Sequence, residues 1–199
     1  MRDGKDLRID FVAGPVAHRF RFGGGRGQPL AKAMGLTDGK TPAIVDATAG
    51  LGRDSFLLAS LGAKVMMIER SPRMHALLAD GLERAAQEGG ELQEIVSRMT
   101  LFLGDAKDLL PQLDAEAVLV DPMHPARKKS ALVKLELRQV REIVGEDDNA
   151  LELMQVALQH AKKRVVLKWP VNAEPIAGVR PFSHQIFGKT MRYDVFMNS

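Results

Sequence analysis

The chain has 199 residues, of which 45% are hydrophobic and 27% charged, and its formal net charge is +3. This length suits one α/β domain with a sizeable core and is short for two, and no apolar run approaches the roughly 20 residues of a membrane span. Because the chain has no cysteine and does not open with a secretory-type segment, we expect a soluble, cytoplasmic protein without membrane association. Its histidines lack metal-ligand spacing, so we also expect no metal site.

Residues 1–40 are predicted to form an N-terminal extension on a domain that spans residues 41–199. Apolar and polar residues alternate over 9–12, which favours a short edge strand. The glycine-rich residues 20–27 predict an irregular loop or a hairpin. A short helix is expected over 29–34, because a proline occupies its first turn and a glycine follows its end.

From residue 43 the pattern alternates between strand-like and helical stretches. Strands are expected at 43–48, 64–69, 99–103 and 117–121, and helices at 54–61, 72–87 and 106–113. Further helices are expected at 132–144 and 150–161, followed by a strand at 164–168 stopped by Pro170 and by a hairpin of strands 183–187 and 192–197. This order predicts a Rossmann-like α/β fold: a mostly parallel seven-stranded sheet with helices on both faces and a C-terminal antiparallel hairpin.

The stretch 44–56 passes from a β-branched strand ending on an acid, through two close glycines, into a helix. Gly50 and Gly52 permit positive φ and let a ligand approach the backbone, and the helix that follows offers unpaired N–H groups. A dinucleotide fingerprint would need glycine or alanine where Ser55 stands, and no phosphate-binding Gly-Lys-Ser/Thr is present. The Asp46-x-x-x-Gly-x-Gly pattern is similar to the first motif of class I methyltransferases that use S-adenosylmethionine. An ordinary strand–helix turn, with glycines placed for packing, is the alternative.

Acids also close the following strands, where ligands bind in parallel sheets. Glu69 follows Gly50 at about the 20-residue spacing of an acid that accepts ribose hydroxyls, and we expect its carboxylate to be exposed at the strand end. Asp105 stands where an acid can accept a hydrogen bond from an adenine amine. A surface carboxylate at a turn explains Asp105 equally well.

The fourth strand end, Asp121-Pro122-Met123-His124, carries the candidate catalytic residues. Methylating an exocyclic amine of a base is difficult because the nitrogen lone pair is delocalised into the ring. The Asp121 carboxylate and the Pro122 carbonyl can accept the amine hydrogens and turn that lone pair toward a methyl donor. His124 can stack on a base or cap the loop, and no general base is required. The alternative is a loop entry stiffened by proline.

Basic residues gather in clusters that could contact phosphates. In residues 18–26 arginines alternate with phenylalanines, and both side chains can stack on unpaired bases. Solvated surface charge is the alternative, and it is favoured for the run 162–164. The candidate RNA-binding residues are Arg19, Arg21, Arg26, Arg127, Lys128, Lys129 and Lys134.

Taken together, three motifs and the Asp-Pro-Met loop resemble the RsmJ family, bacterial enzymes that methylate the N2 amine of a guanine in 16S ribosomal RNA. The motifs are FGGGRG at 22–27, DATAGLGRD at 46–54 and KSALVK at 129–134. The resemblance runs from about Phe11 to the C-terminus and implies a class I methyltransferase fold, S-adenosylmethionine as donor, and 16S ribosomal RNA or the small ribosomal subunit as partner. With the glycine loop, it places donor contacts at Asp46, Gly50, Gly52, Arg53, Asp54, Glu69, Arg70, Asp105, Ala106 and Asp121.

Two departures from the family pattern bear on the substrate. Family members carry an additional N-terminal domain that this chain lacks, and a phenylalanine stands where this chain has His124. Two other functions stay open at this point. DPP-type motifs also serve amino-methyltransferases that act on DNA adenine or on a protein amide, and a catalytically silent module could keep the fold and dock on the ribosome.

Overall fold

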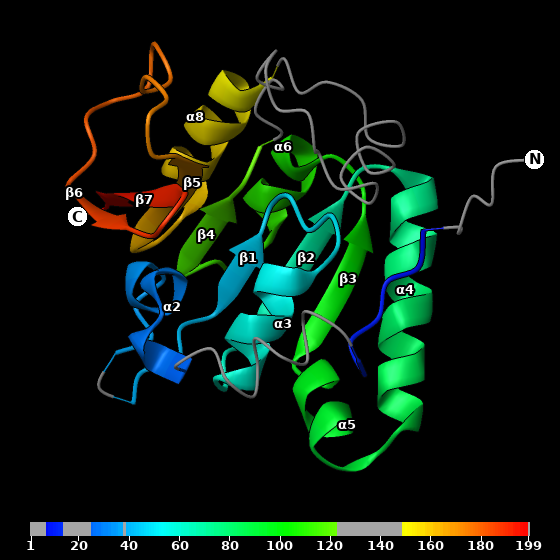
Figure 1. The fold of residues 1–199 in the computed structure, drawn as a ribbon. Coiled ribbons are helices and arrows are strands. Elements are labelled where there is room, and N and C mark those ends of the chain that lie inside the picture. The colour runs from blue at the N-terminus through cyan, green and yellow to red at the C-terminus, as the bar shows by residue number, and fades with distance from the viewer. Residues whose placement is uncertain (1–6, 14–24, 38, 123–148, 199) are drawn as a thin grey trace, which may run out of the picture.

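The computed structural model describes residues 7–13, 25–37, 39–122 and 149–198, which form a twisted sheet with helices on both faces (Figure 1). The strands are β1 Ile44–Asp46, β2 Val65–Glu69, β3 Met99–Leu103, β4 Ala117–Val120, β5 Arg164–Pro170, β6 His184–Phe187 and β7 Met191–Met197. They form one seven-stranded sheet in the order β3-β2-β1-β4-β5-β7-β6.

The first five strands of this order pair in parallel, and β7 enters between β5 and β6 with antiparallel pairing on both sides. β1 lies at the centre of the parallel part, where Asp46 pairs with Met67 of β2 and Leu119 of β4. The order reverses beside β1, because the chain first adds β2 and β3 on one side and then β4 and β5 on the other. Ligand sites of parallel sheets lie at this switch point. The predicted fold class is confirmed.

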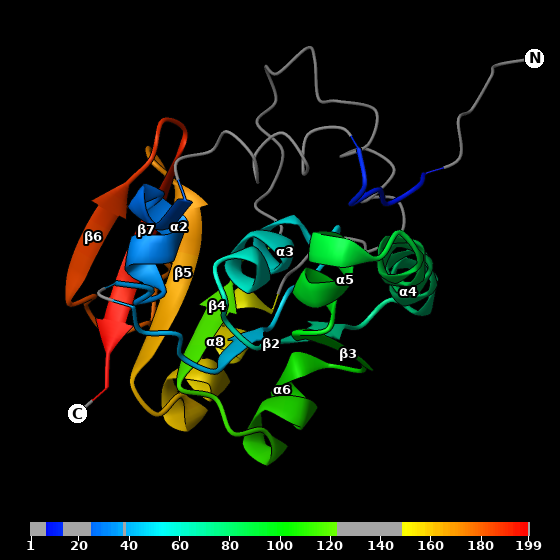
Figure 2. The same cartoon turned by 90° about the horizontal axis from the view of Figure 1, so that it is seen from below.

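The helices cover the sheet in two layers, which Figure 2 shows from below. One face carries α2 Pro29–Ala33, α3 Arg53–Ser60, α4 Pro72–Gln87 and α5 Gly90–Val96, and the other carries α6 Ala106–Leu109, the 3-10 turn η2 Leu110–Gln112 and α8 Ala150–His160. Each layer buries its own apolar cluster, one around Phe56 and Leu78 and the other around Leu110 and Met154. A short 3-10 turn, η1 Gly25–Gly27, precedes α2. Among the helices that the structure describes, none combines the length and apolar character that a membrane crossing requires.

The predicted edge strand over residues 9–12 is wrong. Residues 7–13 form no sheet ladder, although Leu7, Ile9 and Phe11 are buried and alternate with exposed residues. The reason is that their partners are helices. The Phe11 ring stacks on Phe56 of α3 with centroids 5.0 Å apart, and the Ile9 carbonyl accepts a hydrogen bond from Arg84 of α4.

Other differences are local. Pro170 does not stop β5 early; it is the last residue of the strand and pairs with Met191. The expected helix over 106–113 is divided into α6 and η2, because Pro111 supplies no N–H for a continuous helix. The helix α5 was not predicted, and the helix predicted at 132–144 lies outside the described residues.

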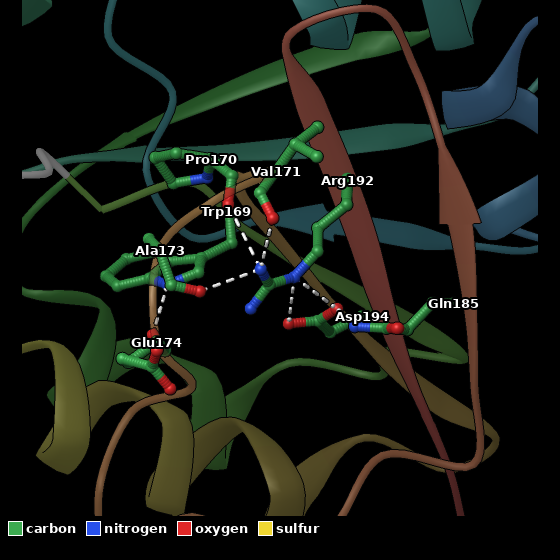
Figure 3. Close-up of polar contacts among 8 residues, drawn as sticks. All are labelled: Trp169, Pro170, Val171, Ala173, Glu174, Gln185, Arg192 and Asp194. Atoms are coloured by element: carbon green, nitrogen blue, oxygen red, sulfur yellow. Dashed lines mark hydrogen bonds and ion pairs between the residues drawn. The ribbon is translucent and has the colours of Figure 1, made fainter.

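A buried ion pair fastens the end of β5 to β7 (Figure 3). Arg192 and Asp194 are 5% and 1% exposed, and the arginine Nε lies 3.0 Å from Asp194 Oδ1. The Arg192 Nη1 group donates to the carbonyls of Pro170, Val171 and Ala173 at 3.2, 2.9 and 2.8 Å. Gln185 of β6 donates to the same aspartate at 2.6 Å. One guanidinium therefore ties the segment after β5 to the antiparallel part of the sheet.

Candidate functional site

A pocket of about 310 Å³ opens at the C-terminal ends of β1, β2 and β4. Of the residues predicted to bind the donor, all but Gly52 line it: Asp46, Gly50, Arg53, Asp54, Glu69, Arg70, Asp105, Ala106 and Asp121. The lining residues that the sequence reasoning did not select include Thr48, Lys107, Asn149, Leu153 and Lys168. Residues from both sides of the topological switch point thus meet in one cavity.

The two glycines of the loop have different roles. Gly50 has φ +51° and lines the pocket. Gly52, with φ +66°, is the N-cap of α3, and a Cβ there would stand 2.7 Å from Leu78 Cδ1 and 3.0 Å from Phe11 Cζ. Gly52 therefore lets the loop pack against α4 and the residue 7–13 segment, and it does not line the cavity.

Glu69 is buried, with 4% of its surface exposed, so the expectation of an exposed carboxylate is wrong. Its two oxygens accept hydrogen bonds from the backbone N–H groups of Gly50, at 3.0 Å, and Ser71, at 2.8 Å. Burial follows from these contacts, because the loop after β1 folds over the end of β2. Each oxygen keeps a second lone pair that can accept a ligand hydroxyl. Glu69 thus holds the loop in place and also lines the pocket.

Asp46 is 3% exposed and closes β1 beneath the pocket. Its Oδ2 accepts from the Ser55 hydroxyl at 2.5 Å and its Oδ1 from the Thr48 N–H at 3.1 Å. Burial raises the pKa of Asp46 to about 6, although these hydrogen bonds oppose the rise and the carboxylates of Asp54 and Asp121 add to it. An ionised Asp46 is therefore costly to the folded protein.

We expect Asp46→Asn to stabilise the fold at neutral pH by about 1–3 kcal/mol. The pKa of Asp46 is higher in the folded protein than in the unfolded chain. The wild-type protein therefore loses stability as the pH rises from about 4 through about 6, and it recovers that stability when Asp46 is protonated at lower pH. The gain in the variant should therefore be larger at pH 7.5 than at pH 4. Urea unfolding of both proteins at the two pH values measures it. An equal gain at both pH values would contradict a raised pKa.

Lys168 of β5 connects two carboxylates of the site. Its Nζ lies 2.7 Å from Asp54 Oδ2 of α3 and 2.6 Å from Asp121 Oδ2 at the end of β4. Burial disfavours the charge on Lys168, but Asp121 and Asp54 outweigh it and raise its pKa above the ordinary value. Burial also disfavours the charge on Asp121 and so raises its pKa. Lys168 opposes this rise, and Asp54 adds to it. The sequence signal for Lys168 is a charge inside the otherwise apolar run 165–169 of β5.

Neighbouring contacts fix the remaining site residues. The Asp121 N–H donates to Thr48 Oγ1 at 2.7 Å, which joins the end of β4 to the loop after β1, and Pro122 is buried beside it. Asp105 caps α6 by accepting from the Lys107 N–H at 2.8 Å. Within the described residues no group of acids or histidines is arranged to hold a metal ion.

Most of the predicted RNA-binding residues lie in parts of the chain that the structure does not describe. Met123 and His124 of the candidate loop lie outside the described residues, as do Arg19, Arg21, Arg127, Lys128, Lys129 and Lys134. Arg26 is described, and its guanidinium donates to the carbonyls of Lys40 and Leu61 at 2.9 and 2.8 Å. Leu61 follows the C-terminal end of α3, whereas the pocket lies at the N-terminal end of that helix.

Known proteins resemble this chain over nearly its whole length. Residues 2–198 match the model of a family described as "Putative SAM-dependent methyltransferase". A protein of Brucella anthropi named Ribosomal RNA small subunit methyltransferase J is 66% identical over 197 residues, which cover 99% of this chain and 96% of that protein. A protein of the same name from Agrobacterium fabrum is 64% identical, with coverage of 95% and 91%. The crystal structure of a SAM-dependent methyltransferase from Neisseria gonorrhoeae is similar with a TM-score of 0.75 and 36% identity, covering 96% of this chain and 74% of that one.

Proposed function

Because this chain belongs to the family of S-adenosylmethionine-dependent methyltransferases whose curated members are named ribosomal RNA small subunit methyltransferase J, we propose that it methylates the N2 amine of a guanine in 16S ribosomal RNA. The family membership establishes the donor and the class of reaction. The ribosomal RNA substrate, the guanine and the nitrogen are the proposal, as are the cytoplasm as its location and the small subunit as its partner.

The observation that carries the proposal is that Asp121 and the loop after β1, the predicted donor loop, line one pocket, with Pro122 next to Asp121 in the chain. The lining fits S-adenosylmethionine, because it offers carboxylates to a cationic molecule with ribose hydroxyls and has no phosphate-binding motif. We assign Asp46, Gly50, Arg53, Asp54, Glu69, Arg70, Asp105 and Ala106 to the donor. When bound, the donor supplies an electrophilic methyl group on a sulfonium. The domain that binds it is residues 41–199, on which α2 of the N-terminal extension packs against β7 and β6.

The residues at the end of β4 are assigned to the target amine. The Asp121 carboxylate and the Pro122 carbonyl accept its two hydrogens, which directs the nitrogen lone pair away from the ring plane and holds the base for an in-line transfer. The amine becomes strongly acidic once it carries the new methyl group, so it loses its proton without a dedicated base. Met123 and His124 extend the same loop and are assigned to the base.

Mass spectrometry of 16S ribosomal RNA tests this function. Small subunits from cells that lack the gene should gain one N2-methylated guanine when incubated with the purified protein and S-adenosylmethionine. Methyl transfer to DNA or to a protein amide would replace the proposal with an amino-methyltransferase of another substrate class. Donor binding and subunit binding without any transfer would indicate a silent docking module.

The basic residues give a separate prediction about RNA binding. Removing the charges of Arg26, Lys128 and Lys129 together should flatten the salt dependence of binding by a log–log slope of about two to three if each contacts one phosphate. Since the Arg26 guanidinium is engaged by two backbone carbonyls, we expect the two lysines to account for most of that change. Titrations of the Lys128→Ala/Lys129→Ala and Arg26→Ala variants against RNA at several salt concentrations measure each share. Lys162→Ala/Lys163→Ala is the control, and an unaltered slope in the triple variant would assign these charges to solvated surface.

A further inference from the structure

Lys168 occupies the junction of three elements that build the site. β5 pairs with β4 in parallel with Leu167 opposite Val120, so Lys168 lies beside Asp121 one step along both strands. Its ammonium contacts Asp121 on one side and Asp54 of α3 on the other. The Lys168 and Asp54 side chains are only 21% and 12% exposed, and that of Asp121 is 34% exposed. The contact is therefore partly shielded from water. Shielding strengthens the attraction between the opposite charges.

The surroundings of Asp121 are rich in negative charge. The carboxylate of Asp54 acts on Asp121, Asp121 in turn acts on Asp46, and Lys168 is a cation in direct contact with Asp121. The other charged residues that line the pocket are Arg53, Glu69, Arg70, Asp105 and Lys107. Without the lysine, Asp54 and Asp121 would lose the counter-charge that they share, and protonating one of them would relieve their repulsion.

A protonated Asp121 could not serve the amine in the proposed way. A carboxylate only accepts hydrogen bonds, whereas a carboxylic acid also presents an O–H donor. The structure shows that Lys168 engages Oδ2 of Asp121, and within the described part of the chain no hydrogen bond reaches Oδ1. The pairing thus fixes one oxygen and leaves the other for a ligand.

We propose that Lys168 is a positioning residue for methyl transfer, which keeps Asp121 ionised and holds its carboxylate so that Oδ1 can accept from the target amine. This inference rests on the proposed function for the identity of the amine. Lys168 acts through Asp121 and need not touch the donor or the base.

The test is the pH dependence of the single-turnover rate at saturating donor in Lys168→Met and Lys168→Arg. In Lys168→Met the acid limb of the pH–rate profile, where the rate falls as Asp121 becomes protonated, should move to higher pH by about one unit or more. This is the usual effect of losing an opposite charge in contact. Below the new midpoint, the rate should fall about tenfold for each pH unit by which the pH is lowered. Lys168→Arg keeps the charge and should return the limb to within about half a unit of the wild-type position.

Two controls isolate the effect. Lys163→Met removes a lysine from another carboxylate pair, with Glu116 at the opposite end of β5 and β4, and its acid limb should match that of the wild type. Because Asp46 titrates near pH 6, Lys168→Met is also made in the Asp46→Asn background. The shift should persist there, which assigns it to Asp121 and not to Asp46.

A readout without substrate separates this inference from the proposed function. Carboxyl ¹³C titration of the full chain, with Asp121→Asn to assign the signal, should show the Asp121 midpoint rising in Lys168→Met. An unchanged midpoint or acid limb would overturn the role of Lys168, as would a tighter donor Kd with an unaltered rate, because the lysine would then merely occupy space that the donor needs. A raised midpoint in a protein that methylates no ribosomal RNA would leave the role of Lys168 intact and refute the proposed function.

Discussion

Replacing Asp121 with asparagine is expected to lower the single-turnover rate of methyl transfer by about a hundredfold or more, the usual scale for losing one preorganised polar group. Asparagine keeps the shape of the side chain and removes its charge. It also presents an NH₂ group, which repels an amine donor instead of accepting from it. The Kd of S-adenosylmethionine should change much less, because the assigned role of Asp121 lies with the target.

Measuring donor Kd and single-turnover rate on the same variant decides the role, since a rate loss at near-native Kd fits only a contact made in the transition state. Asp105→Asn is the matched comparison, because asparagine preserves the cap of α6. We expect the opposite split there: weaker donor binding and a much smaller rate loss at saturation. If affinity and rate fall together in Asp121→Asn, Asp121 contacts the donor. If neither changes, the loop after β4 is structural and the active site lies elsewhere.

Replacing Arg192 with methionine is expected to lower the free energy of unfolding by about 3–5 kcal/mol, because a buried carboxylate is left without its partner. Asp194 is 1% exposed and, among the residues that the structure describes, would keep only the Gln185 hydrogen bond (Figure 3). The carbonyls of Pro170, Val171 and Ala173 would also lose the donor they share. Urea denaturation at neutral pH measures the loss.

Two variants show whether the loss comes from the unpaired charge. Arg192→Met/Asp194→Leu removes both partners and should recover most of the stability, because an apolar pair of similar size can replace a buried ion pair. Arg98→Met breaks a pair with the exposed Glu94 at 4.0 Å and a long hydrogen bond of 3.4 Å to the Ala59 carbonyl, and it should cost about 1 kcal/mol or less. A loss of that small size for Arg192→Met would mean that water reaches Asp194 and that the pair is not a fastening point.

Local chemistry determined which helices and strands could be predicted. The bounds of α4 agree with the predicted range because Ser71 caps its first turn and Pro72 opens it. The helix α5 was not predicted, because Gly89 and Gly90 are typical of turns and here take φ +72° and +54° at the start of a helix. In residues 7–13 the alternation of buried and exposed residues is real, yet alternation alone does not tell whether a sheet or a helix covers the buried face.

In the candidate site too, features set by local sequence could be predicted, and features set by packing could not. Acids at strand ends were predictable because parallel strands bring their C-terminal ends to one edge. The link between Lys168, Asp54 and Asp121 was not, since it depends on how β4, β5 and α3 pack together. The burial of Glu69 was not predicted for a similar reason. Its partners are backbone N–H groups, and every residue type except proline has one, so the sequence does not indicate them.

Asp54 and Asp121 share the ammonium of Lys168, and Asp46 lines the same pocket, which has a consequence for product release. The donor arrives with a positive sulfur, which a surplus of carboxylates attracts through a partly dehydrated pocket. Once the methyl group has left, that sulfur is neutral, and the spent molecule no longer receives this share of the attraction. The same acids then favour an incoming donor over the by-product. The charge of the pocket therefore favours the exchange of spent for fresh donor.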